Sequence, residues 1–102
     1  MRREKKSRRG RKKVAIKILK EINEKDEKGD YIVVYDFGKR IPTEFYKGIE
    51  YLKEETKDDG IIINRWQKSV YYTNSKQIAL AIKSLAEHYH AKVLVLRISE
   101  VL

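Results

Sequence analysis

The first thirteen residues, MRREKKSRRGRKK, form the densest group of side chains that could do chemistry. They hold nine Lys or Arg and one acid, Glu4, so this segment carries +8 of the chain's net charge of +9. Adjacent cations can neutralise several phosphates, and the release of counterions then drives a binding that weakens steeply as salt rises. Such contacts read no base, so the predicted binding to DNA or RNA is indifferent to sequence. The predicted nucleic-acid contacts of this segment are Arg2, Arg3, Lys5, Lys6, Arg8, Arg9, Arg11, Lys12 and Lys13.

The same charge also suits a solubilising extension, an anionic lipid surface or an acidic protein partner. Beyond residue 13 the chain holds 15 Lys or Arg against 14 Asp or Glu, so its body is close to neutral. The first eleven residues have no apolar side chain after Met1 and repel one another. We therefore expect a flexible basic arm over residues 1–11 and a single compact domain over residues 12–102.

Two further stretches, FGKR at 37–40 and RWQK at 65–68, each set an aromatic ring beside two cations. An exposed ring next to Lys or Arg is what a base-stacking surface needs. In the alternative reading, the two rings point inward and close the ends of the core, which leaves the cations to solvent. The predicted nucleic-acid site therefore also includes Lys39, Arg40, Arg65 and Lys68.

A protein contact is the rival hypothesis, and a near-neutral body suits it. Tyr71 and Tyr72 are adjacent, so in a strand they face opposite ways, and tyrosine is common at interfaces. A strand interrupted by Pro42 would leave a sheet edge open, and a groove between two repeat units could take an extended peptide. A homodimer is a further option. The predicted protein-interaction residues are Phe37, Trp66, Tyr71 and Tyr72.

Catalytic chemistry has little support in the sequence. The chain contains no cysteine, no Gly-rich phosphate loop and no hydrolase or zincin motif. On a helix His88 and His90 would point about 200° apart, so they would not both bind one metal. Asp36 near Glu44 could be half of a magnesium nuclease site, but a solvent-facing acid beside a cation is the simpler interpretation. We predict no enzyme activity, no metal site and no cofactor.

Hydrophobic periodicity predicts the elements that must position these residues. An amphipathic helix begins at residue 12, with Val14, Ala15, Ile18, Leu19 and Ile22 on one face. Gly38 and Lys39 make a two-residue turn between strands, Thr43 caps a helix, and Asn74 with Gln77 forms a capping box. The predicted order is strand 31–37, strand 40–41, helix 44–56, strand 61–66, strand 69–73, a helix from residue 75 to about 90, and strand 92–98.

The segments 28–41 and 57–70 match at a spacing of 29 residues, which suggests one unit used twice. The identities are Lys28 with Lys57, Asp30 with Asp59, Ile32 with Ile61, and Lys39 with Lys68. We therefore predict an α+β fold of two tandem strand–strand–helix units, at about 28–56 and 57–90, with an N-terminal helix and a C-terminal strand. The expected sheet is mixed, with about five strands and with helices on one face.

The composition is rich in Lys, Glu, Ile and Tyr, a bias that is typical of hyperthermophiles. The sequence has no run of apolar residues long enough for a membrane span and no secretory signal, so we predict a cytoplasmic, intracellular protein. In its length, its basic start and the paired IVVYDFGKRI and IIINRWQKSV, the chain resembles the small proteins of filamentous viruses that infect hyperthermophilic archaea. That resemblance implies a role inside a host cell and supplies no functional residue.

Overall fold

The computed structural model describes residues 14–22 and 25–102. It is an α+β fold in which four strands form one antiparallel sheet of order β2-β3-β1-β4. After a helical segment at residues 14–21, the elements are β1 (Lys28–Asp36), α2 (Thr43–Thr56), β2 (Ile63–Gln67), β3 (Val70–Ser75), α3 (Lys76–His88) and β4 (Lys92–Ile98). Residues 1–13, which include the expected arm over 1–11 and all nine predicted cations of the N-terminal segment, lie outside the described residues.

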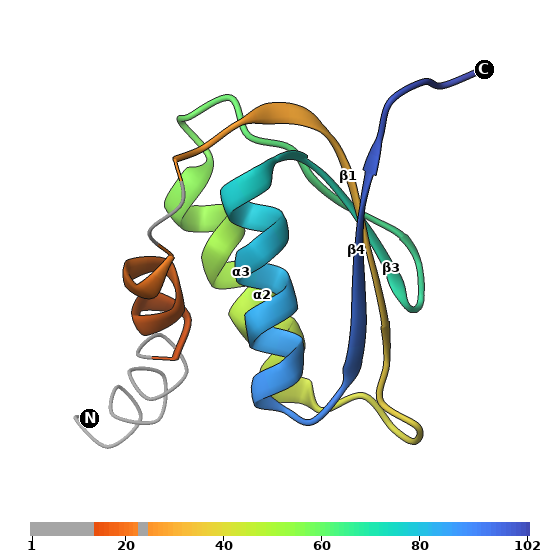
Figure 1. Cartoon of the computed structure of the whole chain (residues 1–102). Coiled ribbons are helices and arrows are strands. Elements are labelled where there is room, and N and C mark those ends of the chain that lie inside the picture. The colour runs from red at the N-terminus through yellow and green to blue at the C-terminus, as the bar shows by residue number, and fades with distance from the viewer. Residues whose placement is uncertain (1–13, 23–24) are drawn as a thin grey trace.

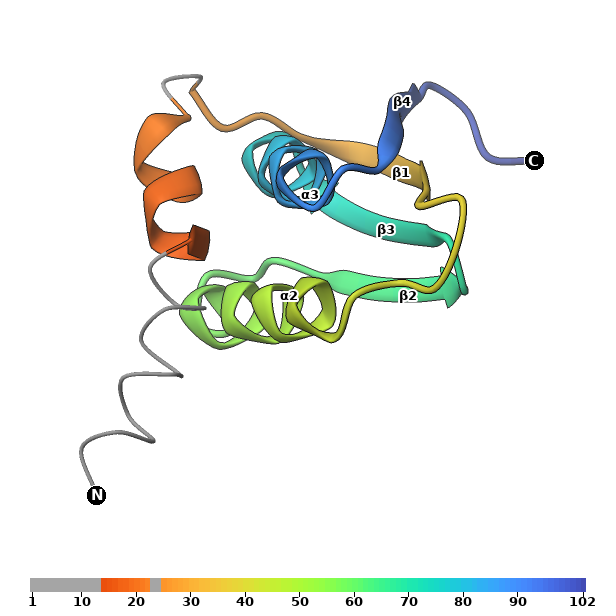
Figure 2. The ribbon, with the colours of Figure 1, turned by 90° about the horizontal axis from the view of Figure 1, so that it is seen from below.

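The helices all lie on one side of the sheet, as Figures 1 and 2 show. The two central strands turn alternate side chains toward the helices, because successive residues of a strand face opposite ways. Tyr31, Val33 and Tyr35 of β1 and Tyr71 of β3 are at most 3% exposed and join the core. From α3, that core receives Ile78, Ile82 and Leu85, which are also at most 2% exposed. These side chains form the apolar layer between sheet and helices.

The predicted hairpin after the first strand does not form. Gly38 takes a left-handed conformation, with φ of +75°, and the chain then runs through an irregular segment directly into α2. The sequence predicts that residues 40–41 pair with the strand before them, but β1 pairs with β3 and β4 instead. Pairing with the longer strands β3 and β4 on its two sides lets β1 bury more apolar surface than pairing with a two-residue strand would. The described sheet therefore has four strands rather than five.

The tandem repeat is also wrong as predicted, because its first unit lacks a second strand. The connectivity is β-α-β-β-α-β, which is the split βαβ, or ferredoxin-like, arrangement. Its two halves, β1–α2–β2 and β3–α3–β4, each contribute one central and one edge strand. In this arrangement β1 corresponds to β3, whereas the 29-residue offset aligned β1 with residues 57–65, which form the loop after α2 and the start of β2. All pairs are antiparallel, so the sheet is not mixed.

The predicted caps also differ from the observed ones. Thr43 is the first residue of α2, whose N-cap position is Pro42. Asn74 faces away from the helix: its Oδ1 accepts from the Ile62 backbone N at 2.8 Å. The N-cap of α3 is Ser75, whose side chain accepts from the Ile78 backbone N at 3.2 Å. Ser75 is buried, so the hydroxyl satisfies a backbone donor that water cannot reach.

Candidate interaction surface

The face of the sheet turned away from the helices is largely apolar. We call it the open sheet face; its apolar residues are Ile32, Val34, Trp66, Val70, Tyr72, Leu94, Leu96 and Ile98. None of the eight belongs to the core cluster between the sheet and the helices, although Ile32, on a central strand, is only 9% exposed. Leu94 is 57% exposed, Leu96 45% and Trp66 55%. An apolar patch of this kind on a folded chain marks an interaction site more often than a chance grouping does.

Trp66 and Tyr72 are the aromatic pair of the open sheet face. Their rings are parallel, with an interplanar angle of 3° and centroids 5.1 Å apart. A β-bulge between Arg65 and Gln67 places Trp66 beside Tyr72 instead of directly opposite one residue of β3. The Tyr72 hydroxyl donates to Asp30 Oδ1, a hydrogen bond that raises the pKa of Tyr72, as does partial burial. The bond orients the Tyr72 ring, against which the Trp66 ring stacks.

The four predicted interaction residues therefore divide between the two faces. Trp66 is exposed, so for this residue the inward-pointing alternative is wrong. Phe37 packs against the core, 5.2 Å edge-to-face from Phe45, as that alternative proposed. Tyr71 is 3% exposed, and burial raises its pKa to about 12, so it cannot contact a partner. Only Trp66 and Tyr72 remain on an accessible surface.

The predicted cations of the body are all exposed, but they are not all on one face. Lys39 and Arg40 follow β1, and Lys68 lies in the turn between β2 and β3. The Tyr35 hydroxyl donates to the Lys68 carbonyl at 2.8 Å, which holds these two connections at the same end of the sheet (Figure 1). Arg65 instead turns to the helix side, where its guanidinium lies 4.8 Å from the ring centre of Tyr46.

Sequence reasoning missed Leu94, Leu96 and the other aliphatic residues of the open sheet face. The sequence did carry a signal for these residues, because KVLVLRI at 92–98 is apolar on both faces of the strand: Val93 and Val95 alternate with Leu94, Leu96 and Ile98. That pattern is expected of a strand covered on both faces. In the structure β4 is an edge strand, and the helices cover one face only.

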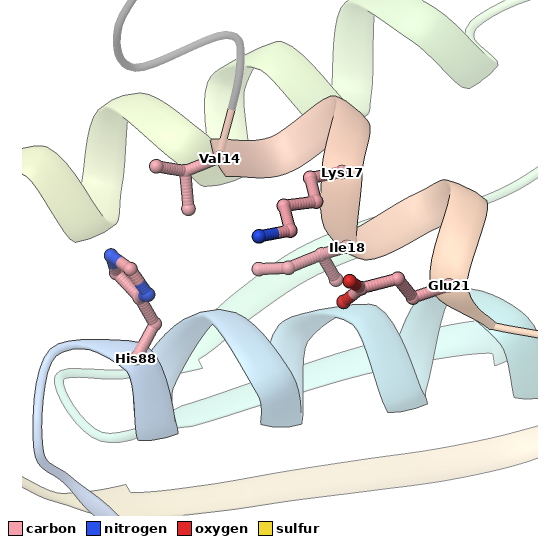
Figure 3. Close-up of a pocket in the computed structure, with 5 residues that line it drawn as sticks. All are labelled: Val14, Lys17, Ile18, Glu21 and His88. Atoms are coloured by element: carbon pink, nitrogen blue, oxygen red, sulfur yellow. The ribbon is translucent and has the colours of Figure 1, made fainter.

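A cleft of about 290 Å³ lies between the helical segment at 14–21 and the end of α3 (Figure 3). Its lining residues are Val14, Lys17, Ile18, Glu21 and His88. One imidazole and one carboxylate are too few to hold a metal ion, and no group of three or more metal-ligating side chains occurs within residues 14–22 and 25–102. His90 takes no part in the cleft; it lies two residues beyond the last residue of α3 and has a φ of +72°.

Comparison with known proteins adds no identity to this geometry. No protein family, curated protein or solved structure gives a significant match to the chain. The resemblance to viral proteins thus stays a prediction. Among the described residues, no helix has the length and apolar character needed to cross a membrane.

Proposed function

We propose that this chain is a non-enzymatic binding module that contacts nucleic acid, without sequence preference, through the basic residues of 1–13. The observation that carries the proposal is the separation of charge: +8 falls within thirteen residues, and the rest of the chain is nearly neutral. Dense positive charge favours phosphate binding by counterion release. The neutral body would add little attraction of its own.

Trp66 offers this proposal a second contact, with an unpaired base. Bases stack on an aromatic ring whatever their identity, and four-stranded antiparallel sheets use exposed aromatic residues in this way on single-stranded RNA. The ring is 55% exposed and held parallel to Tyr72. Lys39, Arg40 and Lys68 lie in the two connections that the hydrogen bond from Tyr35 to the Lys68 carbonyl brings to one end of the sheet, where they could contact phosphates on either side of such a base.

The test is a titration with a single-stranded oligonucleotide and a duplex across a range of salt. We expect affinity to fall steeply with salt, and to be mostly lost when residues 1–11 are removed. Trp66 is the only tryptophan, so its fluorescence reports base stacking directly. Quenching by the single strand but not by the duplex would support the stacking contact. If the intact chain does not bind at low salt, the proposal is wrong.

A matched pair of variants distinguishes binding by the basic residues of 1–13 from binding by the net charge of the whole chain. Replacing Arg8, Arg9 and Arg11 by Ala removes the same charge as replacing Lys47, Lys53 and Lys57, which lie in or just after α2. The first variant should lower the slope of log affinity against log salt by about 2 to 3, because each lost phosphate contact removes about 0.7 to 0.9. The second should change the slope little. Equal changes would assign the binding to net charge alone.

A protein contact on the open sheet face is the second candidate function, favoured by the exposure of Leu94 and Leu96. The groove between two repeat units does not carry this proposal, because those units do not form as predicted. In an extract treated with nuclease, the native chain should recover a protein that a Leu94→Lys variant does not recover. Equal recovery by both chains would contradict a contact at this face.

A further inference from the structure

We infer that the protein partner is a second copy of this chain, joined at the edge of the open sheet face by antiparallel pairing of β4 with β4 of the partner subunit. The inference rests on the second proposed function and is independent of nucleic-acid binding. It follows from three properties of β4. No other described strand pairs with its outer edge, its outward backbone groups can bond to the same groups of a second copy, and its side chains are compatible in that pairing.

The edge formed by β4 lacks the devices that keep strands from associating. All seven of its residues pair with β1 in an unbroken register, without a bulge or a proline. Its middle residues, 93–96, are uncharged; Lys92 lies at the start, and Arg97 is held 3.4 Å from Glu27. The opposite edge, β2, has five residues and a bulge, which disfavours strand addition there. A further strand would therefore add at β4.

Alternation of the backbone identifies which groups of β4 point outward. The Tyr35 backbone N donates to the Ser69 carbonyl at 3.1 Å, so Tyr35 bonds toward the β3 side. The next residue in each direction bonds toward the other side, which makes Val34 and Leu94 a hydrogen-bonded pair. By the same alternation, the N–H and C=O groups of Val93, Val95 and Arg97 point away from the sheet. These are the groups that a second strand would satisfy.

A two-fold axis at Val95 pairs β4 with itself over its whole length. Val95 then lies opposite the partner's Val95, which places outward backbone groups against outward backbone groups. Leu94 lies opposite the partner's Leu96, so four exposed leucines meet on the open sheet face. Arg97 lies opposite the partner's Val93, and Lys92 opposite the partner's Ile98. No like charges oppose each other, and the interface is isologous, as two-fold dimers require.

The start of the described chain lies on the side of the molecule away from this dimer interface. Figures 1 and 2 both place the helical segment at 14–21 beside the other helices, on the side of the molecule away from β4. Val14, where the described chain begins, is therefore remote from the two-fold axis. The pairing would extend the sheet to eight strands and would join two segments of +8 charge in one particle.

The test is the mass of the purified full chain in solution, measured by light scattering after nuclease treatment at high salt. We expect twice the mass of one chain. Leu94→Lys with Leu96→Lys should halve that mass, because it places four cations where the leucines meet. Ile62→Lys, a matched change at a residue that is 44% exposed beside the opposite edge, should leave the dimer intact. Circular dichroism would show that each variant is folded.

Hydrogen exchange at single amides distinguishes this dimer from one made by stacking two open faces. In the inferred dimer, the Val95 amide becomes protected as protein concentration rises. In a stacked dimer it stays unprotected, and that result would overturn the inference. Val95→Pro is a second variant that tests the pairing. The Val95 N–H points away from β1, so replacing Val95 by proline removes a hydrogen bond to the partner subunit but none to β1. A monomeric native chain, or a dimer that Val95→Pro leaves unchanged, would also overturn it.

Discussion

Gly48 lies in the middle of α2 and faces α3 across a very short gap. A Cβ placed on it would be 2.6 Å from Leu85 Cδ2. Leu85 is 1% exposed, so its side chain has little room to move. The close contact at this glycine is therefore between two helices, α2 and α3. The gap, rather than helix propensity, accounts for glycine at this position.

We expect Gly48→Ala to lower the free energy of unfolding by up to about 2 kcal/mol. Alanine favours a helix by up to about 1 kcal/mol over glycine, but overpacking a rigid core costs about 1 to 3 kcal/mol. In a Leu85→Ala background the added methyl group meets no side chain, so the same change should be neutral or stabilising. Urea unfolding of the four chains measures this coupling. An equal effect in both backgrounds would refute the contact.

At the scale of elements, α3 is held at its start by a residue far away in sequence. Asp26 Oδ1 accepts from the Gln77 backbone N at 3.1 Å, from Ser75 Oγ at 2.9 Å and from the Glu27 backbone N at 2.9 Å. Partial burial would raise the pKa of Asp26, but the hydrogen bonds from Gln77, Ser75 and Glu27 outweigh it, so this pKa is lowered. The loop before β1 is thereby fastened to the helix that follows β3.

We expect Asp26→Ala to lower the free energy of unfolding near neutral pH by about 1 kcal/mol, as the loss of a helix cap does. Because the folded-state pKa is depressed, this contribution is present above the usual value of 3.8 and is lost as pH falls through the folded-state value. The two chains should therefore become equally stable in strong acid. Urea unfolding measured against pH tests this, with Asp58→Ala, an exposed acid in the turn after α2, as control.

At the scale of the whole molecule, we expect the buried and partly buried tyrosines to limit stability in alkali. Burial raises the pKa of Tyr31, Tyr35, Tyr51 and Tyr71, with Tyr71 reaching about 12. A group with a raised folded-state pKa stabilises the fold fully below its unfolded value. That contribution is lost as pH rises through the folded-state value. The pH range over which these side chains lose their stabilising contribution thus begins near pH 10, the usual pKa of tyrosine.

We expect the free energy of unfolding to fall steeply above pH 10, by up to about 1.4 kcal/mol per pH unit for each such tyrosine. Tyr71→Phe removes one of these groups, so its decline between pH 10 and 12 should be shallower than that of the native chain. Urea unfolding at several alkaline pH values gives the two slopes, and tyrosinate absorbance follows the ionisation. Equal slopes would show that Tyr71 ionises freely in the folded chain.

Local pattern determined much of this fold from the sequence alone. The helix predicted from residue 75 to about 90 and the strand predicted at 92–98 both form, because the burial of an apolar stripe depends on residue spacing over a few helical turns or strand positions. The α+β class and the helices on one face follow from the same patterns. Charge segregation is likewise a property of the sequence and depends on no contact.

Strand partners were decided only by the tertiary structure. Gly38 with Lys39 could make a hairpin, but β1 instead pairs with two strands that begin more than thirty residues later. The same is true of the site: alternation requires Tyr71 and Tyr72 to face opposite ways, yet only the position of the helices decides which of the two is buried. Which strands pair, and which face of the sheet the helices cover, both depend on contacts between segments distant in the sequence. No local pattern encodes these contacts.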